Sequence, residues 1–173
     1  MRRCSECTGR RLAFAQARAA VAYDGPVRRI VAAWKERGLR KLAAWAAEVV
    51  AEAIEKPAAD CVAFVPADRE RNLQRGYHAA ERLARELGSC WELPVAPLLV
   101  RTRAARPQRG LDHAARRRNV RAAFRALPAT GDVLLVDDVY TTGATVNAAA
   151  STLRRAGARR VEVVTFARTI RLR

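Results

Sequence analysis

The stretch that decides the fold lies in the last third of the chain and reads Val133-Leu134-Leu135-Val136-Asp137-Asp138-Val139-Tyr140-Thr141-Thr142-Gly143-Ala144-Thr145. Its four consecutive aliphatic residues predict a strand that is buried on both faces, as in a parallel sheet. Two carboxylates follow at the end of this strand, and a helix is expected to open at Ala144. In an open α/β sheet, ligands bind at the carboxyl ends of the strands. The stretch therefore predicts a ligand site where this helix begins.

The residue types of the turn suit a ribose 5-phosphate. A loop that leads into a helix N-terminus offers free backbone N–H groups and the positive end of the helix dipole, which favour a phosphate. Thr141, Thr142 and Thr145 add hydroxyl donors, and Gly143 lets the backbone approach closely. The two acids would repel a phosphate, but carboxylates accept hydrogen bonds from a sugar diol. The alternative is an ordinary connection between a strand and a helix with polar turn residues.

The composition indicates one folded domain with a strong positive charge. The chain has 173 residues, half of them hydrophobic, which is enough for a core and excludes a disordered chain. Lys and Arg total 33 against 17 Asp and Glu, a net charge of +16 at pH 7. This charge suits nucleic acid or a phosphate-rich small ligand, and solvated helix faces are the alternative. No apolar run approaches the ~20 residues of a membrane helix, so we expect a cytoplasmic protein without a membrane partner.

The chain contains four cysteines, two of which form a C-x-x-C pair. Cys4 and Cys7 make half of a zinc ribbon, but tetrahedral zinc needs four ligands and the chain has no second C-x-x-C. We predict that residues 1–17 are the remnant of a zinc-ribbon-like segment and that residues 18–173 form the main domain. The alternative is a zinc site that is completed from another subunit. Cys61 lies in an apolar run and is expected to be a buried small hydrophobe.

The remaining pattern predicts alternating strands and helices, hence an α/β fold with a parallel sheet. Further strands are expected at about 18–23, 61–65, 98–101, 120–124 and 161–166. Helices are expected at about 26–37, 39–55, 77–87, 112–119 and 144–156. Gly88 is expected to cap the third helix, and Lys35 to complement the dipole at the end of the first. The buried face of the second helix is expected to contain Leu42, Trp45, Ala46, Val49 and Ala53.

Two basic segments are expected to act on an anionic ligand. The loop 67–75 follows the strand 61–65, and its cationic character at a strand end suits pyrophosphate, through Arg71, Arg75 and Gly76. A solvated surface loop is the alternative. The segment 101–118 is long and rich in Arg, which is typical of a mobile lid, whereas a nucleic-acid patch and simple solvation are the alternatives. The lid residues are expected to include Arg103, Arg106, Gln108 and Arg116.

The central stretch is similar to the loop that binds 5-phosphoribosyl 1-pyrophosphate (PRPP) in type I phosphoribosyltransferases: an aliphatic strand, two acids, two further residues and Thr-Thr-Gly-x-Thr. From about residue 23 onward, the chain resembles the ComF branch of that superfamily, the competence-protein-F proteins. The landmarks are Tyr23-x-Gly25-Pro26-Val27, Lys35-x-Arg37-Gly38, Val65-Pro66, Arg75-Gly76-Tyr77, Gln108-x-Gly110-Leu111 with Arg116 and Asn119, and the central loop. The resemblance implies a parallel sheet flanked by helices, with a small hood over the site.

The resemblance also implies a chemistry. Asp137 and Asp138 would be the catalytic residues, holding the ribose hydroxyls, and residues 141–145 would bind the 5-phosphate. Mg²⁺ would bridge pyrophosphate and ribose oxygens, bound mainly through the ligand. A nitrogenous acceptor would then attack C1. Thr141 stands where purine-type enzymes have an Asp, which makes a purine acceptor less favoured. Three departures from the common ComF pattern are His78 for Asn, Asp112 for Ser and Ala115 for an acid.

Two classes of function stay open at this point. The first is a phosphoribosyltransferase of nucleotide metabolism that acts on an unidentified acceptor. The second is a non-catalytic competence accessory protein that senses a phosphoribosyl ligand or binds single-stranded DNA. The positive charge favours a DNA role, whereas the intact acid pair and loop favour ligand binding. The sequence leaves homo-oligomer formation open.

Overall fold

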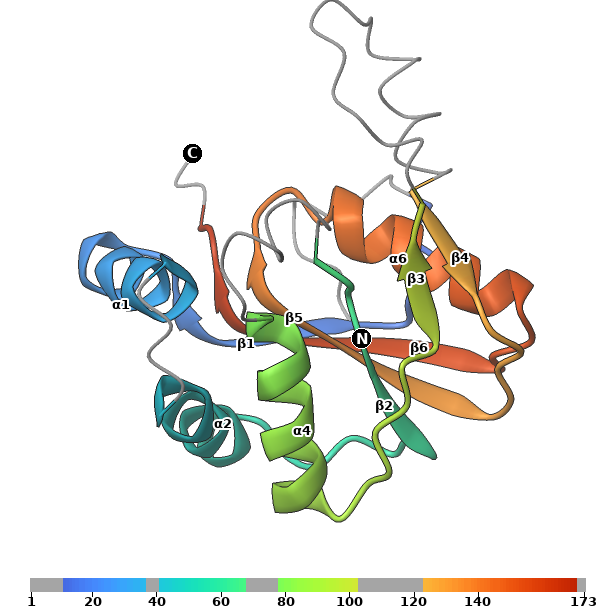
Figure 1. Ribbon diagram of the computed structural model, residues 1–173, viewed down its shortest axis with the longest axis horizontal. Coiled ribbons are helices and arrows are strands. Elements are labelled where there is room, and N and C mark those ends of the chain that lie inside the picture. Colours follow the sequence, from blue (N-terminus) through green and yellow to red (C-terminus); the bar gives the residue numbers. More distant parts are fainter. Residues whose placement is uncertain (1–10, 37–40, 68–77, 103–122, 171–173) are drawn as a thin grey trace, which may run out of the picture.

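The computed structural model describes residues 11–36, 41–67, 78–102 and 123–170. Within these ranges, four strands form a parallel sheet in the order β1-β6-β5-β2 (Figure 1). The strands are β1 (Ala17–Ala22), β2 (Cys61–Phe64), β5 (Asp132–Tyr140) and β6 (Arg160–Arg168). The two central strands, β5 and β6, are also the two longest, and nearly all of their aliphatic residues are buried. This arrangement confirms the predicted parallel sheet flanked by helices.

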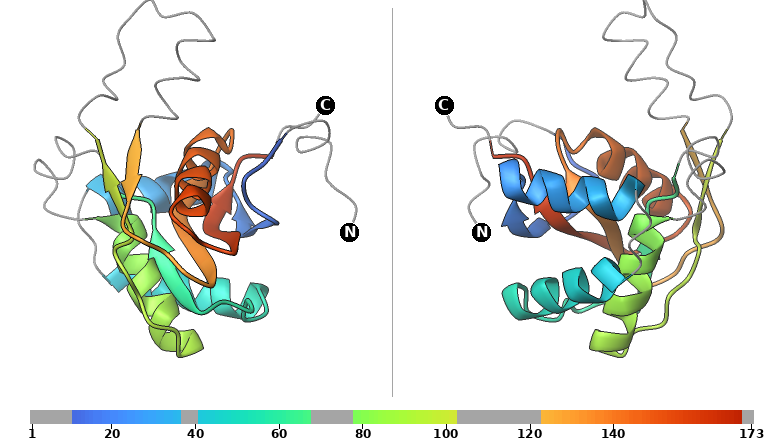
Figure 2. Two further views of the ribbon diagram at one scale, coloured as in Figure 1. Left: turned by 90° about the vertical axis from the view of Figure 1, so that its right-hand side faces the viewer. Right: turned by 60° about the vertical axis from the view of Figure 1, so that its left-hand side comes forward.

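Helices cover both faces of the sheet, as a parallel sheet requires. They are α1 (Gly25–Glu36), α2 (Lys41–Ala53), α4 (Ala79–Trp91) and α6 (Ala144–Arg155). One buried cluster joins α1, α2 and α4 to one face, and a second joins α6 to the other. The views in Figure 2 show α6 apart from the other three helices. None of the helices in the described ranges has the length and apolar composition that a membrane span needs.

A pair of short antiparallel strands lies beside the main sheet, also within the described ranges. These are β3 (Leu99–Arg101) and β4 (Phe124–Ala126). The chain that leads into β3 runs along β2, since Val62 and Val95 form a parallel bridge. The side chains of Leu99 and Phe124 are buried in the cluster under α6. The pair therefore extends the fold on the β2 side (Figure 1).

The segment before β1 packs on the same domain. Phe14 is buried in the cluster under α6. The backbone N–H of Ala13 donates to Asn147 Oδ1 at 2.8 Å, and that of Ala15 donates to the Val161 carbonyl at 2.8 Å. The division of the chain at residues 17 and 18 stays a prediction, because residues 1–10, including Cys4 and Cys7, lie outside the described ranges.

The central strand is longer than its aliphatic run. It continues through the acid pair to Tyr140, so Asp137 and Asp138 lie within the strand and not after it. The reason is the equally long neighbour β6, which offers ladder partners as far as Arg168. The predicted start of the next helix at Ala144 is confirmed.

One prediction about a helix was right only in part, and another was wrong. Of the residues predicted for the buried face of α2, Ala46 is buried and Leu42 and Val49 pack half-buried against the same cluster, whereas Trp45 is 41% exposed and Ala53 is exposed. The fully buried residues of α2 are Ala43, Ala46, Ala47 and Val50. A stripe of alanines lets the helix backbone approach its neighbours closely, and the larger Trp45 ring is left at the margin, edge-on to Phe166.

Gly88 does not end α4, which continues to Trp91 and reverses at Glu92 with φ 52°. A Cβ on Gly88 would overlap Val95 Cγ2 and lie 2.9 Å from the Leu93 carbonyl oxygen. This glycine therefore serves close packing of the returning chain, not helix termination.

Candidate functional site

The candidate site lies at the carboxyl edge of the sheet, where β5 turns into α6. The acid pair lies in the last part of β5, which ends at Tyr140, and three residues, 141–143, connect this strand to α6. Thr141, Thr142, Ala144 and Thr145 are all exposed. The first N–H groups of any helix lack partners within that helix. The turn thus places exposed Thr141 and Thr145 beside two carboxylates.

Gly143 sets the shape of this turn. It adopts φ 72°, a left-handed conformation that L-residues rarely adopt, and it stands at the N-cap of α6. A Cβ at this position would overlap the hydroxyl of Tyr140, whose ring is buried and faces the Arg168 guanidinium at 5.7 Å. The Thr142 hydroxyl accepts the N–H of Ala144 at 3.4 Å. The turn is therefore built on a fixed base of Tyr140 and Arg168.

The two acids differ in their surroundings. The Asp138 N–H donates to Asp137 Oδ1 at 2.9 Å, and Asp138 Oδ1 accepts a hydrogen bond from Lys35 Nζ at 2.7 Å. Desolvation, together with the charge of Asp138, raises the pKa of Asp137 to about 8, although Lys35 and Arg101 oppose this. Asp137 therefore keeps its proton to a higher pH than an ordinary aspartic acid does.

Lys35 contacts the acid pair, a role that was not predicted from the sequence, although Lys35 belongs to one of the landmarks of the ComF resemblance. Local sequence predicted only an interaction with the helix dipole, and Lys35 does lie in the last turn of α1. Its contact with Asp138 spans 103 positions, which no local pattern encodes. Burial of Val31 and Trp34 fixes α1 on the sheet, and Trp34 packs edge-on against Phe166 with ring centroids 6.1 Å apart. The fixed helix directs the Lys35 side chain to the acid pair.

A second cation lies on the β2 side of the acid pair. The Arg101 guanidinium stacks over the Phe124 ring, 5.4 Å from its centroid, and donates to the Pro66 carbonyl oxygen at 3.5 Å. It is one of the charges that oppose the raised pKa of Asp137. Arg101 therefore joins β3 to the end of β2 and adds positive charge at the edge of the site. The sequence placed this residue only at the start of the basic segment.

His78 fastens the start of α4 to the end of β2. Its Nε2 lies 3.1 Å from the Val65 carbonyl oxygen and its Nδ1 lies 3.3 Å from Glu81 Oε2. The ring packs edge-on against Phe64 at 5.4 Å between centroids. The carbonyl can only accept, so Nε2 carries a proton in this arrangement. The histidine that departs from the common ComF pattern thus has a structural task at this junction.

Other predicted site residues lie outside the described ranges. These are the pyrophosphate-loop residues Arg71, Arg75 and Gly76, and the lid residues Arg103, Arg106, Gln108 and Arg116. The structure brings together the acid pair, the turn 141–145, Lys35 and Arg101.

The acid pair can contribute to Mg²⁺ binding only as part of a larger ligand set. Among the described residues, no three His, Cys, Asp or Glu side chains are grouped so that they could hold a metal ion. Two adjacent carboxylates, one of them bonded to Lys35, are too few for a site made by the protein alone. They fit Mg²⁺, which commonly takes most of its ligands from phosphate oxygens and water.

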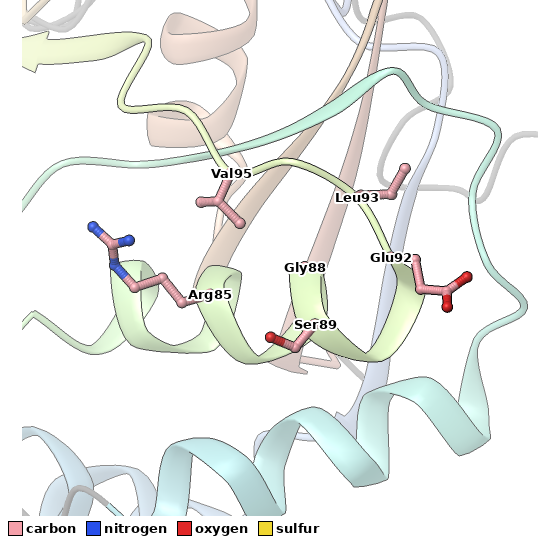
Figure 3. Close-up of a pocket in the computed structure, with 6 residues that line it drawn as sticks. All are labelled: Arg85, Gly88, Ser89, Glu92, Leu93 and Val95. Carbon is pink, nitrogen blue, oxygen red and sulfur yellow. The ribbon is translucent and has the colours of Figure 1, made fainter.

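A pocket of about 410 Å³ lies elsewhere, at the last turns of α4 (Figure 3). Helix α4 starts at the carboxyl end of β2 and runs back along the sheet. The chain after α4 passes β2 near its first residues, where the Val62 N–H donates to the Pro94 carbonyl. The pocket therefore lies at the amino edge of the sheet, away from the acid pair. Its lining residues are Arg85, Gly88, Ser89, Glu92, Leu93 and Val95.

The parallel sheet and the acid-pair turn at the start of a helix define a phosphoribosyltransferase-like α/β protein. The family model described as phosphoribosyl transferase domain matches residues 39–172, and the chain belongs to this family. The DNA utilization protein YhgH of Salmonella typhi is 37% identical over 120 residues, which cover 66% of this chain and 52% of that protein. Competence protein F of Haemophilus influenzae is 30% identical over 141 residues, which cover 78% of this chain and 62% of that protein. The predicted ComF relationship is confirmed.

The matched residues cover only part of the length of these relatives. YhgH of Escherichia coli K12 is 37% identical over 117 residues, or 64% of this chain and 50% of that protein. The chain therefore spans about half the length of the DNA utilization proteins that it matches.

Proposed function

We propose that the chain binds PRPP at the carboxyl edge of its sheet and transfers the phosphoribosyl group to a nitrogenous acceptor. The observation that carries the proposal is the pair of adjacent carboxylates on β5, separated by two residues from an exposed, hydroxyl-rich turn at the N-terminus of α6. Asp137 and Asp138 would accept hydrogen bonds from the ribose diol, and the turn 141–145 would donate to the 5-phosphate. Family membership supports a phosphoribosyl ligand.

In this mechanism the protein contributes mainly position and charge. The bond from C1 to the diphosphate breaks, the electron pair leaves with pyrophosphate, and positive charge develops on the ribose ring. The negative carboxylates beside the ring stabilise that positive charge and hold the sugar, so that C1 faces the incoming nitrogen. Mg²⁺, when bound with the ligand, would supply charge to the leaving pyrophosphate. The roles predicted from the sequence complete this mechanism. One loop would hold pyrophosphate through Arg71, Arg75 and Gly76. The Arg-rich segment would close over the ligand and includes Arg103, Arg106, Gln108 and Arg116.

A second function is supported by different observations. The net charge of +16 favours a polyanion, and the similar proteins are named for DNA utilization and for competence. In this alternative, the chain senses a phosphoribosyl ligand without turnover, or binds single-stranded DNA. The first function requires an acceptor and catalytic turnover, whereas the second requires neither.

One experiment separates the two. Labelled PRPP is incubated with the protein, Mg²⁺ and a panel of nucleobases, and both the bound label and the released pyrophosphate are measured. Binding of a fluorescent single strand is measured in parallel at 50 and 200 mM salt. Pyrophosphate release that depends on one base supports the transferase. PRPP binding without release, or strand binding that falls steeply with salt, supports the second function. Absence of PRPP binding and of release would contradict the first.

A further inference from the structure

Lys35 stands beside the acid pair in a geometry that allows a second partner. Its Nζ lies 2.7 Å from Asp138 Oδ1, and 30% of its side chain is exposed against 14% for Asp138. An ammonium group carries three donors, so the one bond to Asp138 leaves donors for a ligand. Lys35 can therefore contact a bound molecule without giving up the carboxylate.

The two faces of the sheet decide which end of the ligand Lys35 meets. The turn 141–145 leads into α6, which packs on one face, whereas α1 with Lys35 packs on the other. In a ribose 5-phosphate unit, C1 and the 5-phosphate lie at opposite ends of the ring, with the diol between them. A ribose that rests its diol on the acid pair and its phosphate on the turn directs C1 toward the α1 face.

The distances agree with contact at C1. A carboxylate-to-hydroxyl hydrogen bond is about 2.7 Å long. Together with the 2.7 Å from Lys35 Nζ to Asp138 Oδ1, it places the ammonium at most about 5.4 Å from a ribose hydroxyl that bonds the same oxygen. A group on the neighbouring C1 lies within reach of a lysine side chain from that position. Lysine binds phosphate as a compact point charge, which suits a flexible diphosphate.

A purely stabilising ion pair explains these observations less well. An ion pair that is partly open to solvent contributes little to stability, typically below about 1 kcal/mol. Part of its favourable energy is offset by the entropy that is lost when a long side chain is held in one position. The start of α4, which follows the loop predicted from the sequence to hold pyrophosphate, also packs on the α1 face. Lys35 thus lies on the side of the ribose where a diphosphate would extend.

We propose that Lys35 is a ligand-binding residue that recognises the diphosphate on C1 of the phosphoribosyl ligand, next to Asp138. The proposal rests on the proposed function, because it requires that the acid pair holds the ribose. Its consequence is a preference: Lys35 makes the site bind PRPP more tightly than ribose 5-phosphate, which carries only an uncharged hydroxyl on C1.

The test compares two ligands on five proteins by calorimetry in Mg²⁺ buffer. The ligands are PRPP and ribose 5-phosphate, and the proteins are the wild type, Lys35→Gln, Lys35→Met, Lys35→Arg and Lys41→Gln. Lys41 is exposed at the start of α2 and controls for loss of one charge. We expect Lys35→Gln and Lys35→Met to weaken PRPP about tenfold or more and to leave ribose 5-phosphate within about twofold. Lys35→Arg should keep most of the preference, and Lys41→Gln all of it.

Other outcomes overturn the proposal in distinguishable ways. Equal weakening of both ligands by Lys35→Gln would mean that Lys35 only orients Asp138. Unchanged PRPP affinity would mean that the ion pair has no part in binding. A wild type that binds neither ligand would contradict the proposed function and, with it, this inference. Melting curves identify a variant that does not fold, and Lys35→Met, which keeps most of the aliphatic stem, then carries the comparison.

Discussion

Replacing Gly143 with Ala tests the turn on which the site is built. Gly143 has φ 72°, and an L-residue held in the left-handed region costs about 1–2 kcal/mol. The added Cβ would overlap the Tyr140 hydroxyl and lie 3.1 Å from its Cε2. Tyr140 is 6% exposed and lies against Arg168, so relief requires a shift in packed structure, which costs about 1–3 kcal/mol more. The free energy of unfolding should therefore fall by about 2–5 kcal/mol.

Gly25→Ala is the matched control, because it makes the same chemical change where the structure allows it. Gly25 is the first residue of α1, is exposed and has nothing within 4 Å of a Cβ. Alanine favours a helix, so this variant should be neutral or more stable by up to about 1 kcal/mol. Urea denaturation followed by far-ultraviolet circular dichroism measures both. A cost at Gly143 below about 0.5 kcal/mol, which is less than its backbone strain alone, would refute the reasoning.

Three further predictions concern the acid pair, the α4 turn and the cysteines. The pKa of Asp137 is raised from 3.8 to about 8 in the fold, so the folded state keeps a proton that the unfolded state loses, and stability should fall as pH rises from about 4 to 8. Urea denaturation between pH 5 and 9 should show that the free energy of unfolding depends less steeply on pH in Asp137→Asn than in the wild type. The difference in slope is at most about 1.4 kcal/mol per pH unit, the value for one proton, and equal slopes would contradict the assignment. Gly88→Ala should destabilise by about 1–3 kcal/mol despite the better helix propensity of alanine, because its Cβ meets Val95 and the Leu93 carbonyl, and a stabilised variant in the same assay would show that the chain at 93–95 yields easily. The purified monomer should contain no stoichiometric zinc, since Cys4 and Cys7 alone cannot complete a tetrahedral site, and one tightly held zinc per chain in elemental analysis would prove this wrong.

The sequence predicted the parts of the fold that depend on local pattern. The aliphatic run at 133–136 identified the central strand, because a strand buried on both faces requires apolar residues at consecutive positions. The glycine before Ala144 identified the start of α6, because a left-handed turn favours glycine. The buried face of α2 was predicted only in part: Ala46 was right, but the large Trp45 was also placed there, while the fully buried stripe consists mainly of alanines. Gly88 misled for a related reason: a glycine can mark a close approach of two chains as well as the end of a helix.

The candidate site was predicted only where its residues are neighbours in sequence. Asp137, Asp138 and the turn 141–145 lie together and could be recognised as one unit. Lys35 bonds to Asp138 from α1, and Arg101 acts on the acid pair through its charge from β3, so both roles depend on how these elements pack on the sheet. Such contacts are tertiary, so a basic residue at a helix end gave no sign of its partner.

The most direct test of the central claim is the affinity of Asp138→Asn for PRPP. The substitution keeps the size of the side chain and removes one charge from the carboxylate that would hold the ribose diol. Titration calorimetry with Mg²⁺ should show that the wild type binds PRPP and that Asp138→Asn binds it about 10- to 100-fold more weakly, the value of a charged hydrogen bond. Glu52→Gln, an exposed charge change on α2, should bind as the wild type does. Equal PRPP affinity of Asp138→Asn and the wild type would mean that the acid pair does not hold the ligand.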